Sequence, residues 1–238
     1  MNKLSFTLLI MLLSGLISSA NALTFNAIKD ENAHNRSAGD PFGSSTSAAN
    51  ILAPAHFNDY SILTYISFDI TSFNNLGLPA ADVSFDLYGR GAKTNLALTI
   101  YGLNDNVTSP AWAESANGQT LYNGSSPNFP GVDSNFNIVP ADVTQLFSGP
   151  VTYTLNSLIN FTGINFTNFI NADSNNEVTL ILALEDNTVT TNHAFHSKDA
   201  SENLPPTLNI TPVPLPAAVW FFVSALIGLV SFRKKEKV

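Results

Sequence analysis

Apolar and polar residues alternate along several short segments in the middle of the chain. The clearest is residues 62–70, in which apolar side chains alternate with small or polar ones over the second half. A period of two is typical of a strand with one buried face. The other segments that predict strands are residues 83–88, 97–103, 151–155, 177–184 and 207–210. Residues 89–95, rich in turn-forming residues, predict a hairpin between two of these strands.

Helical signals are few. Residues 141–147, behind Pro140, and residues 164–171 each predict a turn or two of helix. Many short strands joined by polar connections predict an all-β fold, a β-sandwich most similar to a jelly roll. Periodicity does not separate a jelly roll from an immunoglobulin topology, so both remain open.

The first residues have the order of a secretory signal peptide. Lys3 precedes an apolar run from Leu4 to Ile17, and small residues follow up to Ala20-Asn21-Ala22. The small side chains of Ala20 and Ala22 predict cleavage after Ala22. The apolar run is too short for a transmembrane helix, which needs about 20 residues.

The C-terminal end predicts a single transmembrane helix. An uncharged stretch of 20 residues runs from Val213 to Phe232, and four basic residues with one Glu follow it. About 20 apolar residues match the hydrocarbon thickness of a bilayer. Because basic residues favour the cytoplasmic side, this tip is expected to stay inside while the body is exported.

Three parts are therefore expected: a signal peptide at residues 1–22, one β-sandwich domain at residues 23–212, and a C-terminal segment at residues 213–238.

The net charge of the chain is −8, of which the two ends contribute +4, so the body carries −12. Such a body repels phosphate backbones, and we expect no nucleic-acid partner. The chain has no cysteine, which excludes disulfides, thiolate metal sites and a cysteine nucleophile.

The C-terminal segment resembles the PEP-CTERM class of sorting signals, in the variant that reads Val-Pro-Leu-Pro-Ala. The matching residues are Val213, Pro214, Leu215, Pro216 and Ala217, followed by the apolar stretch and the basic tip. The resemblance implies a partner, an exosortase-like transpeptidase that cuts near the motif after transient anchoring in the inner membrane. It also implies a final location at the cell surface or in the extracellular matrix.

The body more loosely resembles the DNRLRE-type domain, a jelly roll grouped with modules that bind acidic polysaccharides. The matching pieces, in order, are residues 42–44, 51–52, 65–70, 83–88, 112–114, 121–123, 141–144, 194–199 and 205–210. The resemblance implies a non-catalytic domain whose partner is an extracellular polysaccharide.

Two aromatic residues are candidates for sugar binding. Trp112 is the only tryptophan of the body, and Tyr122 follows in the same polar stretch. An aromatic face can stack on a sugar, although a lone Trp more often anchors a loop to the core.

Other polar groups carry weaker expectations. His193 and His196 are three residues apart near a strand end, where alternation sends their side chains to opposite faces, so we expect no shared metal. Acidic and amide residues gather at 104–106, at 185–187, and at Asp199 with Glu202. Their oxygens suit calcium, but none follows the spacing of an EF-hand loop, so no metal or other cofactor is assigned.

Three kinds of function remain open. The first is a non-catalytic surface or matrix protein that contacts polysaccharide. The second is a purely structural biofilm or envelope component without a sugar site. The third is a secreted polysaccharide hydrolase or lyase, which would need two carboxylates facing each other across a cleft.

Overall fold

The computed structural model describes residues 21–34, 51–52, 55–57, 60–107, 120–121, 129–133, 137–184 and 191–214. The chain divides into two units, Ala22–Thr211 and a second unit in which Met1–Asn21 is grouped with Pro212–Val238. Nearly all of the expected signal peptide, and the expected transmembrane helix beyond Pro214, lie outside the described residues.

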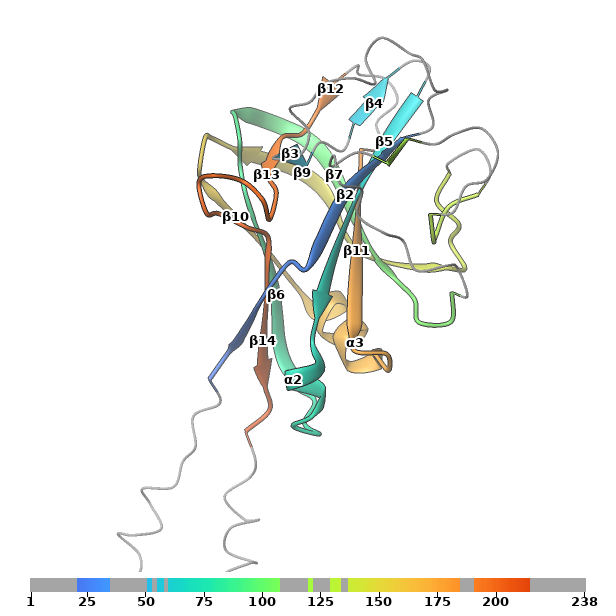
Figure 1. Ribbon diagram of the computed structural model, residues 1–238, viewed down its shortest axis with the longest axis vertical. Coiled ribbons are helices and arrows are strands. Elements are labelled where there is room, and N and C mark those ends of the chain that lie inside the picture. The colour runs from blue at the N-terminus through green and yellow to red at the C-terminus, as the bar shows by residue number, and fades with distance from the viewer. Residues whose placement is uncertain are drawn as a thin grey trace, which may run out of the picture. The chain divides into compact units, whose positions relative to one another are not determined.

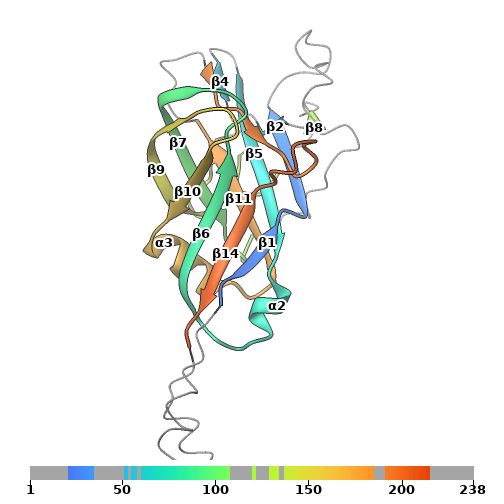
Figure 2. The same cartoon turned by 90° about the vertical axis from the view of Figure 1, so that its left-hand side faces the viewer.

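Two largely antiparallel sheets form an all-β sandwich, as the sequence predicts (Figures 1 and 2). Sheet A contains, in order, β1 (Leu23–Asn26), β14 (Thr207–Pro212), β6 (Ala80–Tyr88) and β10 (Leu158–Thr162). Sheet B contains, in order, β12 (Thr191–Asn192), β4 (Ala55–Phe57), β5 (Tyr60–Asp69), β11 (Glu177–Ala183), β7 (Lys93–Leu103) and β9 (Val143–Tyr153). In the same sheet β2 (Lys29–His34) pairs with β5 and, in parallel, with β8 (Thr120–Leu121), while β13 (Phe195–His196) and β3 (Ile51–Leu52) form a separate pair.

The hairpin predicted between residues 83–88 and 97–103 is wrong. These residues lie on β6 and β7, which belong to different sheets, so the turn between them crosses the sandwich. The Gly89 N–H donates to the Ser157 carbonyl and the Arg90 N–H to the Ala194 carbonyl. Both strands turn apolar side chains toward the space between the sheets, Phe85 and Leu87 from β6 and Leu98 and Ile100 from β7, and facing sheets bury these side chains in one core, which a lone hairpin does not achieve.

The helical turn predicted at residues 141–147 is also wrong. Residues from Val143 onward form β9, which pairs with β7 over its whole length, and this ladder supplies the backbone hydrogen bonds that a helix would have made. Val143 and Val151 are eight residues apart and would share one face of a regular strand, but a bulge between Gln145 and Phe147 places Val143 in the cluster on the outer face of sheet B and Val151 in the core between the sheets. The pairing of β9 with β7, which is distant in the sequence, outweighs the weak local preference of these residues for a helical turn.

The main core lies between the sheets, and a second apolar cluster covers the outer face of sheet B. On β5, Ile66 and Phe68 belong to the main core, whereas Leu63 and Tyr65 belong to the outer cluster. The Tyr65 ring lies 5.2 Å from the ring of Phe129. The central strands of sheet B are therefore buried on both faces.

The helix predicted at residues 164–171 is confirmed as α3 (Ile164–Ala172), and a shorter helix, α2 (Thr71–Asn74), follows β5. Phe166 and Ile170 of α3 enter the main core. Because α3 contacts both β6 and β9, it bridges the two sheets (Figure 1). Of the helices in the described part of the chain, none has the length and apolar character needed to cross a membrane.

Candidate functional site: a polar pocket beside helix α3

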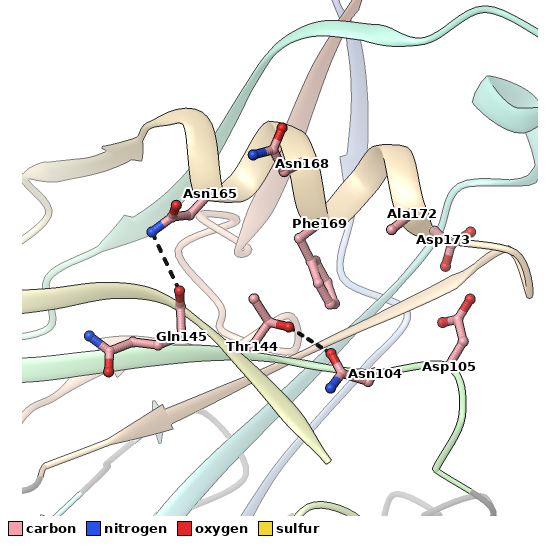
Figure 3. A pocket seen from close by; sticks show the side chains of 9 residues that line it. All are labelled: Asn104, Asp105, Thr144, Gln145, Asn165, Asn168, Phe169, Ala172 and Asp173. Carbon is pink, nitrogen blue, oxygen red and sulfur yellow. Dashed lines mark hydrogen bonds between the residues drawn. The ribbon is translucent and has the colours of Figure 1, made fainter. Parts of the chain in front are cut away.

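A pocket of about 320 Å³ lies beside α3 (Figure 3). Its walls come from α3, from the start of β9 and from the loop that follows β7. The lining residues are Asn104, Asp105, Thr144, Gln145, Asn165, Asn168, Phe169, Ala172 and Asp173. This volume is at the small end of the range for ligand sites, about 300–1,000 Å³.

One stripe of α3 forms a wall of the pocket. Asn165, Asn168, Phe169 and Ala172 follow the spacing i, i+3, i+4, i+7, which places them on one side of a helix. The opposite side carries the residues that enter the core. The helix is thus held by an apolar face and presents amides and one aromatic ring to the pocket.

The Phe169 ring packs directly against Gly102 of β7. A Cβ atom at Gly102 would lie only 2.6 Å from Cε1 and Cε2 of Phe169, so any larger residue would displace the ring. Phe169 packs against the main core and remains half-buried. The close approach fixes an aromatic ring at the pocket wall (Figure 3).

Hydrogen bonds fix the strand side of the pocket. The Thr144 hydroxyl donates to Oδ1 of Asn104 at 2.7 Å, and the Asn104 amide donates to the Ala141 carbonyl at 3.4 Å. A long bond of 3.5 Å joins the Asn165 amide to the Gln145 carbonyl. These bonds connect the loop after β7, the start of β9 and α3.

Asp105 holds the turn that follows α3. Its carboxylate accepts hydrogen bonds from the backbone N–H of Ser174 at 2.6 Å, from the Ser174 hydroxyl at 2.7 Å and from the Asn175 amide at 3.1 Å. Both of its oxygens are engaged. Asp105 therefore acts first as a structural anchor at one end of the pocket.

Asp173 is the C-cap residue of α3 and lies at the same end of the pocket. Oδ2 accepts from the Asn74 amide at 2.8 Å and from the Asn176 N–H at 3.1 Å. Burial raises the pKa of the Asp173 carboxyl, and the negative charge of Asp105 adds to the rise, whereas the Asn74 hydrogen bond opposes it. The two carboxylates thus repel each other at this end of the pocket.

The rest of the pocket is uncharged. Among the residues that line it, none is Lys, Arg or His. The side-chain amides of Gln145 and Asn168 are exposed and have no hydrogen-bond partner within the described part of the chain. They are available for hydrogen bonds with a ligand.

Most of the sugar-binding and sorting residues predicted from the sequence lie outside the described residues. Trp112 and Tyr122 lie outside the described residues, as do Ala20, Leu215, Pro216 and Ala217. Ala22 is exposed immediately before β1, and Val213 and Pro214 follow β14 directly. The structure therefore leaves the two aromatic candidates as predictions.

His193 and His196 are both buried in separate surroundings. Nε2 of His193 lies 2.8 Å from the Ala97 carbonyl, whereas Nε2 of His196 lies 2.8 Å from Oδ1 of Asn156. Burial lowers the pKa of His193 to about 4 and also lowers the pKa of His196. The part of the chain that the structure describes contains no group of three or more metal-ligating His, Cys, Asp or Glu side chains.

Of the acidic clusters considered for calcium, the one at Asn104 and Asp105 contributes to the pocket, and the Asp105 carboxylate accepts hydrogen bonds from Ser174 and Asn175. Asp199 pairs with Lys198 at 2.8 Å. Residues 185–187 are outside the described residues.

Sequence reasoning missed Gln145, Asn168 and Phe169. A signal for two of them was present, because the stripe of α3 lies within the helix predicted at residues 164–171. Gln145 carried no such signal, since its segment was expected to be helical. No protein-family model matches the chain, and a search of curated proteins finds no match either.

Proposed function

We propose that this chain is an exported, non-catalytic protein of the cell surface or extracellular matrix that binds polysaccharide in the pocket beside α3. The observation that carries the proposal is the Phe169 ring, packed on Gly102, in a pocket that is also lined by the amides of Gln145 and Asn168, which have no hydrogen-bond partner among the described residues. A pyranose has a face of C–H groups that packs on an aromatic ring and a rim of hydroxyls that bonds to amides. The Phe169 ring is held by packing on Gly102 before any ligand binds, which lowers the cost of ordering it.

The finer fold assignment is a jelly roll. Numbered from one to eight along the chain, strands β1, β5, β6, β7, β9, β10, β11 and β14 give sheet orders 1-8-3-6 and 2-7-4-5. That order arises when a ribbon of paired strands, 1 with 8, 2 with 7, 3 with 6 and 4 with 5, is rolled into two sheets. It supports the resemblance to the DNRLRE-type domain and disfavours an immunoglobulin topology.

Export and sorting follow from the two ends of the chain. A signal peptide, cleaved after Ala22, directs the body outward, and the segment from Val213 anchors it in the inner membrane until an exosortase-like enzyme cuts near residues 213–217. β1 begins at Leu23 and β14 ends at Pro212, so both cuts leave the sandwich intact. Two prolines in the motif disfavour a helix, which suits a segment that a protease binds in an extended form.

Binding tests the proposal directly. The full chain, purified in a mild detergent, is measured against a panel of neutral and acidic polysaccharides by affinity electrophoresis. Saturable binding to at least one member is expected, and Phe169→Ala is expected to weaken it about tenfold or more because the stacking surface is lost. Asn168→Ala, an exposed change that leaves the core intact, is expected to weaken it as well.

Tyr88→Ala is the matched control, because it removes a half-buried aromatic ring from β6, away from the pocket. The control should bind like the wild type. Loss of binding in Tyr88→Ala with no effect of Phe169→Ala would move the site to sheet A. No binding to any polysaccharide would favour the purely structural role.

A polysaccharide hydrolase is a second candidate, favoured by one observation. Asp173 has a raised pKa beside the carboxylate of Asp105, and such a pair can supply an acid and a base for glycoside hydrolysis. The bonds that commit both oxygens of Asp105 to Ser174 and Asn175 make binding the better-supported function. Release of reducing ends from the bound polysaccharide, abolished in Asp173→Asn, would establish hydrolysis.

A further inference from the structure

The pocket has an uneven distribution of charge. Asp105 and Asp173 place two carboxylates at one end, and the remaining polar lining consists of amides and one hydroxyl. No cation lines it. Sites that bind carboxylate or sulfate groups use Arg or Lys, whose N–H groups match those oxygens.

We propose that the pocket selects uncharged sugars and rejects sugars that carry a carboxylate or sulfate. This selectivity rests on the proposed function and specifies its ligand class. It runs against the acidic ligands implied by the DNRLRE-type resemblance, because the lining supplies no group that compensates an anion.

The attractive part of the selectivity comes from Gln145 and Asn168. Each primary amide offers two N–H donors and one carbonyl acceptor, and neither has a hydrogen-bond partner within the described residues. A sugar hydroxyl both donates and accepts, so a pair of neighbouring hydroxyls can satisfy an amide. A carboxylate only accepts and leaves the amide carbonyls without a donor.

The repulsive part comes from Asp105 and Asp173. Both carboxylates line the same end of the pocket, so an anionic ligand placed there would meet two negative charges. Burial is the main cause of the raised pKa of Asp173, and the negative charge of Asp105 adds to the rise. The pair is held in place by Ser174, Asn175 and Asn176, so it does not swing away from an incoming ligand. The carboxylate or sulfate of an acidic sugar would be repelled by these two carboxylates. The net charge of −12 on the body adds to this repulsion.

Titration calorimetry of the full chain with matched ligands tests the inference. The ligands are an α-glucan, a β-glucan, a mannan and a galactan, each neutral and each oxidised at C6 to the carboxylate. At pH 7 and low salt, the neutral form that binds is expected to do so at least tenfold more tightly than its oxidised partner. High salt should narrow the difference, since it screens charge at a partly exposed site.

Asp173→Asn keeps a carbonyl acceptor but removes one charge, and it should improve binding of the oxidised form by several-fold. Asp82→Asn is the matched control, because Asp82 is exposed on β6 outside the pocket, so that variant should keep the wild-type ratio. Equal or tighter binding of an oxidised form would overturn the selectivity and leave polysaccharide binding intact. Binding to no member would overturn both proposals.

Discussion

At the residue scale, His193 shows how a buried polar group is accommodated in this sandwich. The Tyr153 hydroxyl accepts from the Ala194 N–H at 2.9 Å and lies 3.3 Å from Nδ1 of His193. Nε2 then donates to the Ala97 carbonyl. This pattern assigns a neutral imidazole with its proton on Nε2, since Nδ1 accepts from Tyr153. The low pKa of His193 is the expected result of this environment.

The neutral imidazole makes stability depend on pH. The folded pKa of about 4 lies below the ordinary value of 6.5, so the unfolded chain binds the proton more readily between these values. The shifted pKa of His193 therefore contributes roughly 3 kcal/mol to the free energy of unfolding above about pH 6.5, and this contribution is lost as pH falls toward about 4.

Urea unfolding at pH 7 and pH 4.5 checks this prediction. His193→Gln should be less stable at pH 7 and should lose less free energy of unfolding on acidification than the wild type. Carboxylates titrate in both proteins and cancel in the comparison. The same pH slope in both proteins would mean that His193 is not the source.

At the element scale, the Asn171 side chain joins α3 by hydrogen bonds to the start of β6 in sheet A. The Asn171 carboxamide accepts from the Ala80 N–H at 2.6 Å and donates to the Ala80 carbonyl at 3.1 Å, which imitates one rung of a β-ladder at the start of β6. Because α3 carries a wall of the pocket, this contact connects fold stability to the proposed binding site.

Asn171→Ala is expected to lower the free energy of unfolding by about 1–3 kcal/mol, because both backbone groups of Ala80 lose their partner. Amide hydrogen exchange should rise in α3 more than in β11. Exposed Asn160→Ala, on β10, provides a control outside this contact. Uniform faster exchange throughout the sandwich would instead indicate that α3 is not a separately docked element.

Sequence patterns identified most of the central strands but not their partners. Alternation located β5, β6, β7, β11 and β14, because each buries one or both faces. β2 escaped notice because Asp30, Glu31 and Asn32 look like a surface segment, yet all three are buried. The order of strands in the sheets depends on contacts between distant segments, which a local period does not report.

The candidate site was predictable only in part. The helix that carries Phe169 was predicted, and Asp105 was noticed as a possible oxygen ligand. The pocket needs α3 to pack beside Gly102 and Thr144, residues separated from the helix by about 20 to 60 positions. Only the β7 to β9 pairing and the crossing between sheets bring them together.

At the scale of the whole molecule, export and processing are proposed to release the sandwich as a separate unit. In a host that encodes an exosortase-like enzyme, the mature chain should begin at Leu23 and should lose a tag placed after Val238. Mass spectrometry of the chain ends and immunoblotting of cell fractions measure both events.

The double variant Pro214→Ala, Pro216→Ala should keep the tag and remain in the membrane fraction, because the extended motif is lost. Pro205→Ala, which lies ahead of β14 in the body, should be processed normally. A mature chain that still begins at Met1, or equal loss of the tag in the double variant, would contradict the sorting proposal.

The most direct test of the pocket is to locate a bound sugar by NMR. The full chain, with ¹⁵N-labelled Asn and Gln side chains, is titrated with the neutral polysaccharide fragment that binds most tightly in the panel. The side-chain amides of Gln145 and Asn168 are expected to shift most, with saturation at the calorimetric affinity. Saturable shifts confined to the outer face of sheet A, around Asn160 and Asn209, with none at α3, would contradict the assignment of the pocket as the binding site.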